Sequence, residues 1–199
     1  VGGEIPTKWR KGLIATIYKK GPVEDPGNYR GITLLCHVGK LFSKLVGARL
    51  CTQWKEKEHI CDEQGGFRSN RSTVDQAFIL HQCLLKRKRA GLNSYLFFLD
   101  VRKAFDTVWQ AGLWKKLYEA GVDGKMWRLI RALYENTQSS VLVGGEQTRW
   151  FGAGEKSQGV RQGCPLSSTL FALFVNGLAS KLKETGLAVS YTPLRAHST

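Results

Sequence analysis

The chain has 199 residues, of which 42% are hydrophobic and 23% are charged, as in folded globular proteins. These proportions exclude extensive intrinsic disorder, and the length fits one domain or two small lobes that share a core. Lysine and arginine number 30 against 16 acidic residues, a net charge of +14 that is spread along the whole chain. Such a charge favours a polyanionic partner, with general solubility as the alternative.

Cysteine spacing and hydropathy exclude several further classes. The five cysteines are odd in number and include no C-x-x-C pair, which argues against a disulfide framework or a zinc site. No apolar run reaches the roughly 18 residues of a membrane span, and the first ten residues lack the apolar core of a signal peptide. We therefore expect an intracellular protein, nuclear or cytoplasmic, that is not secreted and not in a membrane. Its oligomeric state is left open.

The first half of the chain predicts a strand and two helices. Residues 12–18 (GLIATIY) are apolar and β-branched and predict a strand, which a basic loop rich in glycine and proline follows. Apolar residues recur at helical spacing from 39 to about 59 and predict a helix. Ser72 and Asp75 form a capping-box pattern for a second, amphipathic helix that ends in the basic run 86–89. That run fits a solvated helix end, with a nuclear-localisation patch as the alternative.

An apolar run and two helices follow. Residues 94–99 (SYLFFL) are continuously apolar or aromatic apart from Ser94, have the length of a strand and end at Asp100, so they predict a buried strand. Helical spacing predicts helices over 112–120 and 125–135, each bounded by a glycine or a turn.

The last third predicts a hairpin and a final helix. Two apolar segments flank residues 144–147, which we expect to be a four-residue hairpin loop. A loop with several glycines then leads to Pro165, which predicts the start of an apolar helix. This order of strands and helices gives the α+β fold class.

Asp100 is the sharpest candidate for chemistry. A carboxylate at the end of a buried strand is held rigidly and suits a hard cation such as Mg²⁺, whereas the alternative is a cap for the next segment. Asp106, six residues later, is interpreted as a local cap or ion-pair partner.

Two loops could bind an anion. The glycines of 159–163 allow close approach to the backbone, and the helix start at Pro165 offers free amides with Arg161 beside them as a contact for phosphate. Lys19, Lys20 and Arg30 could form a second phosphate-binding group, with a solvated loop as the alternative.

Five ordered blocks resemble the reverse transcriptases of LINE-type, non-LTR retrotransposons and together cover roughly residues 5–187. The blocks are YKKGPVEDPGNYRGITLL (18–35), GKLFSKLVGARL (39–50), QGGFRSNRSTVDQ (64–76), FFLDVRKAFDTV (97–108) and GVRQGCPLSSTLFALFVNGL (159–178). The resemblance implies the fingers and palm of a right-hand polymerase, with a ferredoxin-like palm. It also implies an RNA template, a DNA primer and a dNTP as partners, and two Mg²⁺ ions for phosphoryl transfer.

The resemblance also assigns roles to individual residues. Asp100 matches the first metal-binding aspartate, the carbonyl of Val101 matches a second ligand, and Phe105 matches the gate that excludes ribonucleotides. The remaining matches fall in two groups: nucleotide contacts at Lys19, Arg30, Gln162 and Gly163, and template contacts at Arg68 and Arg71.

The chain departs from the family after residue 187. The family's second metal block, an aromatic-x-Asp-Asp hairpin, is absent, and none of the six aspartates adjoins another. We therefore expect 1–187 to be a partial reverse transcriptase domain, truncated before that hairpin and the thumb, and 188–199 to be a divergent tail. Alone, such a chain should be inactive, because one carboxylate cannot hold two closely spaced Mg²⁺ ions. The alternatives are a non-catalytic RNA-binding module and a relic of a decayed element.

Overall fold

The computed structural model describes residues 4–56, 59–152 and 158–186. Its single sheet has the order β2-β1-β3-β4, and β5 pairs with β3 as well. Strand β1 runs antiparallel to β2, with Gly12 opposite Leu35, and parallel to β3, with Ile14 opposite Val141. The strands are β1 (Lys11–Tyr18), β2 (Tyr29–Leu35), β3 (Gln138–Val143), β4 (Glu146–Gln147) and β5 (Phe151–Gly152).

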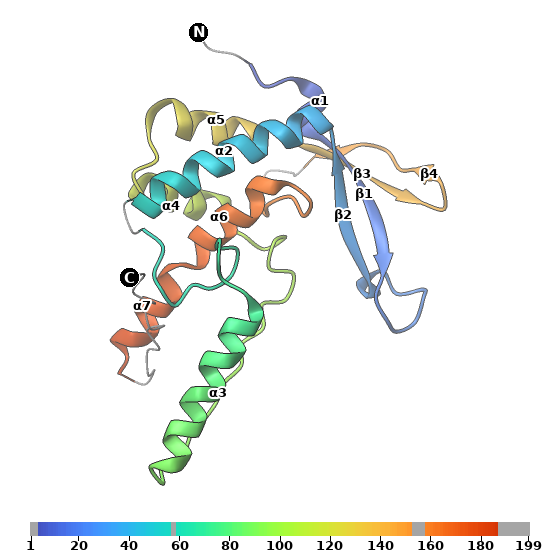
Figure 1. The fold of residues 1–199 in the computed structure, drawn as a ribbon. Coiled ribbons are helices and arrows are strands. Elements are labelled where there is room, and N and C mark those ends of the chain that lie inside the picture. The colour runs from blue at the N-terminus through green and yellow to red at the C-terminus, as the bar shows by residue number, and fades with distance from the viewer. Residues whose placement is uncertain (1–3, 57–58, 153–157, 187–199) are drawn as a thin grey trace.

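Helices pack together to one side of this sheet (Figure 1). Helix α6 contacts both α2 and α4, and α4 contacts α5, so the core lies between these four helices. Its fully buried side chains include Leu50, Leu113, Ile130 and Leu170. The helices are α1 (Thr7–Arg10), α2 (His37–Glu56), α3 (Thr73–Arg89), α4 (Gln110–Glu119), α5 (Gly124–Tyr134), α6 (Pro165–Val175) and α7 (Gly177–Glu184).

The structure confirms the α+β class and most of the expected elements. The capping box of α3 is formed: the Asp75 amide donates to the Ser72 hydroxyl at 3.1 Å, and the Ser72 amide donates to the Asp75 carboxylate at 2.8 Å. Pro165 begins α6 as expected, because its fixed φ suits a first turn and its missing N–H would be unpaired there anyway. Among the described residues, no helix combines the length and apolarity of a membrane span.

Three local expectations are corrected. The basic loop after the first strand was expected over 19–31, but residues 29–31 belong to β2. The hairpin after β3 turns through Gly144 and Gly145 alone, both at positive φ, so its loop has two residues rather than four. The apolar helix that begins at Pro165, expected to extend to Leu182, ends at Val175, and α7 begins at Gly177. Between them the Asn176 side chain donates to the carbonyl of His59 at 2.7 Å and accepts from the amide of Cys61 at 2.9 Å.

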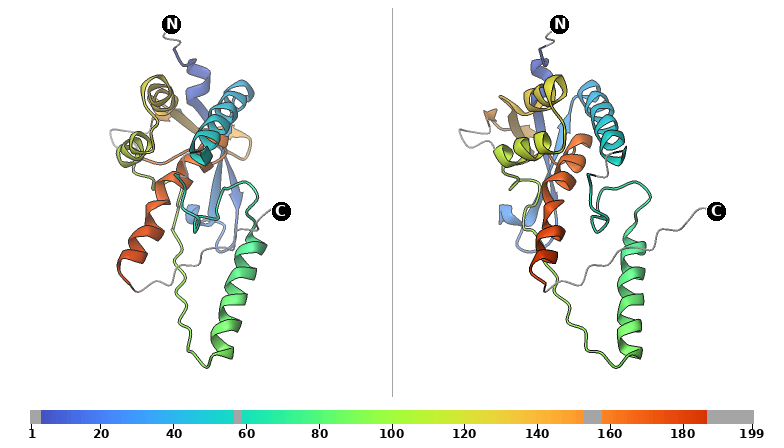
Figure 2. Two further views of the ribbon diagram at one scale, coloured as in Figure 1. Left: turned by 60° about the vertical axis from the view of Figure 1, so that its left-hand side comes forward. Right: turned by 90° about the vertical axis from the view of Figure 1, so that its left-hand side faces the viewer.

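The expected buried strand over 94–99 is wrong for this structure. These residues form no strand with any described residue, and Tyr95, Phe97 and Phe98 are 93%, 88% and 78% exposed. They return from the end of α3 as an extended segment, and the two together project from the body of the molecule (Figure 2). We call residues 72–100 the arm. The apolar run is exposed because the described sheet is built on β1 and β3 and supplies no neighbouring strand for it.

Candidate nucleotide and nucleic-acid site

A glycine-rich junction, residues 158–164, connects three distant parts of the chain. The Gly159 amide donates to the Val108 carbonyl at 2.8 Å, and the Val160 amide donates to the Phe105 carbonyl at 2.7 Å. On the other side, the Gln162 carbonyl accepts from the amide of Thr33 in β2 at 2.7 Å. The junction therefore fixes the segment after Asp100 relative to the β1–β2 hairpin.

Glycine is required at the two ends of this junction. Gly163 has φ +115°, and a Cβ there would lie 2.5 Å from the Thr33 carbonyl oxygen. Gly159 has φ +87°, and a Cβ there would lie 3.0 Å from the carbonyl oxygen of Asp106. Both positions disfavour any side chain through conformation and space. The close approach predicted from these glycines exists, and in this structure the approaching group is the chain's own backbone.

The expected gate residue, Phe105, lies in an aromatic cluster. Its ring stacks on Phe171 of α6 at 5.1 Å between centroids, with 17° between the ring planes. The ring of Phe67 meets Phe105 edge-on at 6.0 Å. These contacts hold Phe105 between the loop before α3 and the helix α6. Asp100 and Val101, which precede it, are exposed.

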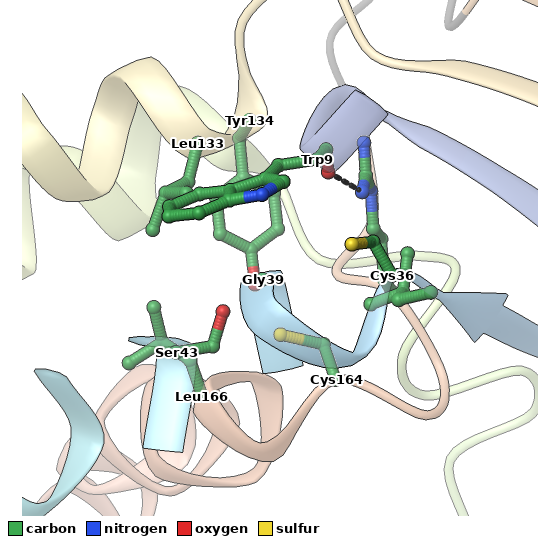
Figure 3. Close-up of a pocket in the computed structure, with 10 residues that line it drawn as sticks. Trp9, Cys36, Gly39, Ser43, Leu133, Tyr134, Cys164 and Leu166 are labelled. Carbon is green, nitrogen blue, oxygen red and sulfur yellow. Dashed lines mark hydrogen bonds between the residues drawn. The ribbon is translucent and has the colours of Figure 1, made fainter. Parts of the chain in front are cut away.

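Arg161 points inward rather than toward solvent. Its guanidinium donates to the backbone carbonyls of Trp9, at 2.9 Å, and Arg10. Figure 3 shows the bond to Trp9 as a dashed line. Burial lowers the pKa of this guanidinium. The side chain expected to contact phosphate thus joins the start of β1 to the junction.

A small hollow surrounds Arg161, with about 20 Å³ of free volume, enough for one water molecule. Tyr134 and Cys164 line it together with Trp9 (Figure 3). The Tyr134 hydroxyl is hydrogen-bonded to the Ser167 hydroxyl at 3.0 Å, and burial raises the pKa of that phenol. The hollow is too small for a nucleotide and acts as part of the core.

The hollow also includes Cys36, directly before α2. Hydrogen bonds from the backbone amides of Gly39 and Val38 lower the pKa of this thiol. They stabilise its thiolate form, as helix N-terminal amides do for anions in general.

Arg68 and Arg71 converge on one carboxylate. Their guanidinium groups lie 3.8 Å and 3.6 Å from Asp62, and Arg68 also donates to the Cys61 carbonyl at 2.9 Å. These contacts order the loop between α2 and α3. The two side chains stay partly exposed, so they present positive charge next to the start of the arm.

Lys19 and Arg30 lie at the far end of the β1–β2 hairpin. Arg30 is directly opposite Ile17, and the pairing continues beyond the strand, where the Lys19 amide donates to the Asn28 carbonyl at 2.9 Å. Alternation along the strand therefore puts Ile17, Lys19 and Arg30 on one face. Lys19, Lys20 and Arg30 are exposed, so the hairpin carries free positive charge.

The described residues do not form a two-metal site. Among them, no group of three or more histidine, cysteine or acidic side chains is close enough to hold an ion. Asp100 stands on an exposed segment, and Asp106, also exposed, forms no ion pair with another described residue. A pair of Mg²⁺ ions needs several carboxylates, so the donor set present does not fit it.

Comparison with known proteins decides the family. The model for "Reverse transcriptase (RNA-dependent DNA polymerase)" matches residues 17–192. The chain belongs to the reverse transcriptase family. This confirms the resemblance seen in the sequence blocks.

Three of its relatives are proteins of mobile elements. The chain is 29% identical over 184 residues to the Pol polyprotein of the R2 element from Popillia japonica, covering 92% of this chain and 25% of the relative. It is 32% identical over 178 residues to the probable RNA-directed DNA polymerase of transposon BS from Drosophila melanogaster, covering 87% and 19%. The jockey polymerase of Drosophila funebris is 32% identical over 196 residues, covering 94% and 20%. This reverse transcriptase chain thus spans a quarter or less of these relatives.

Sequence reasoning missed three residues at or near the junction. Thr33 donates to Gln162 of the junction, Phe171 stacks on Phe105, and the Tyr134 hydroxyl is hydrogen-bonded to Ser167. Nothing in their local sequence marks these contacts. Phe171 was expected only as part of an apolar helix face. The available signal was the pair of glycines at 159 and 163, which indicates that something approaches closely without naming it.

Proposed function

We propose that this chain forms the fingers and part of the palm of an RNA-directed DNA polymerase of a non-LTR retrotransposon. The observation that carries the proposal is the family match over residues 17–192. The relatives' names, RNA-directed DNA polymerase among them, support the reaction class. The net charge of +14 supports a polyanionic template and primer.

The β1–β2 hairpin is the part that would meet the incoming nucleotide. Lys19 and Arg30 share one exposed face of the hairpin, and a lysine and an arginine together can neutralise a triphosphate. Gln162 and Gly163 lie at the hairpin's base, where the Gln162 carbonyl accepts from Thr33. The phosphates of the nucleotide would therefore contact the hairpin, and its nucleobase would contact the junction, residues 158–164.

Phe105 is proposed as the gate toward the sugar. Its stacking on Phe171 and edge contact with Phe67 restrict its rotation, and a gate must resist displacement to exclude a 2′-hydroxyl. Asp100 and Val101 precede it and are proposed as the ligands that this chain contributes to a divalent cation. If carboxylates from elsewhere completed that site, a divalent cation held there would supply positive charge next to the reacting phosphate.

The carboxylates of the described chain do not complete that cation site, so we expect this chain alone to extend no primer. Template binding is separate from chemistry and requires only the basic surface. Arg68 and Arg71, which are partly exposed beside Asp62, are proposed as contacts to the template backbone. Arg161 is not proposed as a template contact, because its guanidinium donates to the backbone carbonyls of Trp9 and Arg10.

A chimera tests the catalytic assignment. Residues 17–187 would replace the matching segment of the Drosophila funebris jockey polymerase, and primer extension on an RNA template would be measured with Mg²⁺ and dNTPs. Asp100→Asn should abolish extension, whereas Asp106→Asn, a matched loss of an exposed carboxylate six residues away, should retain it. Equal losses in the two variants would refute the role of Asp100.

Binding by the chain itself tests the second candidate, a non-catalytic RNA-binding module. The +14 charge favours it, and the affinity for a labelled RNA should fall steeply with salt as counterions are released. RNA binding without any extension in the chimera would favour the module over the polymerase.

Binding of a dNTP tests the role of the hairpin. Arg30→Ala should weaken this binding, and Arg128→Ala, which removes an exposed arginine on α5, is the matched control.

A further inference from the structure

The loop that joins β1 to β2, residues 19–28, is held by the tyrosines at its two ends. It lies at the end of the hairpin remote from α2 (Figure 1). Tyr18, the last residue of β1, donates its hydroxyl hydrogen to the carbonyl of Gly21 at 2.5 Å. Tyr29, the first residue of β2, donates in the same way to the carbonyl of Val23 at 2.9 Å. Each strand therefore contributes one side chain that fixes the loop.

Asn28 connects this loop to Lys19. Its side-chain amide donates to the carbonyl of Pro22 at 2.8 Å, and its backbone carbonyl accepts from the amide of Lys19 at 2.9 Å. Gly21 packs against the same side chain so closely that a Cβ there would lie 2.5 Å from the Asn28 amide nitrogen. The backbone of Lys19 therefore depends on the loop that the tyrosines hold.

The two tyrosines lie on the face of the hairpin opposite to its basic residues. Tyr18 pairs directly with Tyr29, and their ring centroids are 5.5 Å apart. Because adjacent residues of a strand point to opposite faces, Lys19 and Arg30 lie on the other side. In the described part of the chain, neither Lys19 nor Arg30 forms an ion pair. Uncharged donors thus hold the loop on one face, and two positive charges stay available on the other.

We propose that Tyr29, together with Tyr18 and Asn28, positions Lys19 and Arg30 for the triphosphate of the incoming nucleotide. This inference rests on the proposed function of the hairpin. The three positioning residues need not touch the phosphates. A loop that is ordered before the ligand arrives loses less conformational entropy on binding, which strengthens the affinity. Uncharged donors suit this role, because an acidic side chain in their place would compete with the phosphates for the two cations.

Binding of labelled dGTP to the full chain tests this role. Tyr29→Phe deletes only the hydroxyl that donates to Val23, so it should raise the Kd for dGTP about threefold to tenfold, as expected for one net hydrogen bond. The Kd for dGMP, which has a single phosphate, should change less. A p-aminophenylalanine at position 29 places an N–H donor at the same point and should restore most of the affinity. Tyr118→Phe, which removes a hydroxyl from an exposed tyrosine on α4, is the matched control and should leave the Kd unchanged.

A double-mutant cycle distinguishes positioning from a general loss of stability. If Tyr29 acts through Arg30, Tyr29→Phe should have a much smaller effect on the Kd for dGTP when Arg30→Ala is already present. A general loss of stability would weaken binding equally in both backgrounds. In the chimera, Tyr29→Phe should raise the KM for dGTP by a similar factor and change kcat by less than about twofold.

The outcomes separate this inference from the proposed function. An unchanged Kd for dGTP in Tyr29→Phe would overturn the inference, as would an equal loss in both backgrounds, while a weakened Arg30→Ala would still support the function of the hairpin. A loss of affinity for labelled RNA alone would also overturn it and would assign the two cations to template phosphates. If Arg30→Ala binds dGTP as the parent chain does, or if the parent chain binds none, the proposed function of the hairpin is itself wrong.

Discussion

Replacing Arg161 distinguishes a role in the stability of the fold from a role in binding the RNA template. Arg161→Ala removes the donors to the carbonyls of Trp9 and Arg10 and leaves two partly buried acceptors unpaired. Each unsatisfied group costs about 1–3 kcal/mol, and regained solvation of the lost charge offsets part of the sum. We expect a net loss of about 2–4 kcal/mol in the free energy of unfolding. A lysine at this position can still donate toward one of the two carbonyls, so Arg161→Lys should lower the free energy of unfolding by roughly half as much.

Urea denaturation followed by tryptophan fluorescence measures this loss. With a slope of about 2 kcal/mol per molar urea, the midpoint should fall by about 1–2 M for Arg161→Ala. Arg128→Ala, at an exposed position on α5, is the control and should change stability by less than about 0.5 kcal/mol. An unchanged midpoint for Arg161→Ala, accompanied by a large loss of RNA affinity, would refute the inward placement and restore the template role.

Three further outcomes follow from the contacts described. Gly163→Ala should destabilise the chain by about 2 kcal/mol or more, because its Cβ would meet the Thr33 carbonyl at 2.5 Å; a melting temperature equal to that of the parent chain would contradict the close approach. Hydrogen bonds from Ser72 lower the pKa of Asp75, so the carboxylate stabilises α3 above its unfolded pKa of about 3.9 and loses this effect as pH falls through the lower folded pKa. The protection of α3 amides against exchange, corrected for the intrinsic exchange rate at each pH, should therefore fall below about pH 4 in the parent chain but change much less in Asp75→Asn. Iodoacetamide should alkylate Cys36 at a lower pH than an unfolded-peptide thiol, given the lowered pKa of Cys36, and coincident pH profiles would argue against its contacts with the α2 amides.

The sequence predicts those elements whose signals are local. Ser72 and Asp75 fix the start of α3 through contacts three residues apart, and Pro165 fixes the start of α6 through its own ring. The two helices expected at 112–120 and 125–135 appear as α4 and α5 with shifts of one or two residues. Each of these depends on neighbours within one or two helical turns.

The errors come from features whose meaning depends on distant residues. An apolar run such as 94–99 predicts a strand that needs partners, but the number and position of those partners are set elsewhere in the chain. Arg161 has the residue type of a phosphate contact, and only the arrival of Trp9 and Arg10 from the other end of the chain turns it inward. The glycines at 159 and 163 correctly indicate close approach, yet their neighbours could not be named in advance.

The parallel pairing of β1 with β3 has a consequence for synthesis of the protein on the ribosome. Ile14 cannot pair with Val141 until Val141 has been synthesised, and the hydrogen bond between Thr33 and Gln162 can form only later. At about 5–20 residues per second, the N-terminal hairpin spends several seconds outside the exit tunnel before its neighbouring strand exists. During that interval β2 covers one edge of β1, and the edge that β3 later covers has no strand beside it. The nascent hairpin is therefore an expected point of contact for a chaperone.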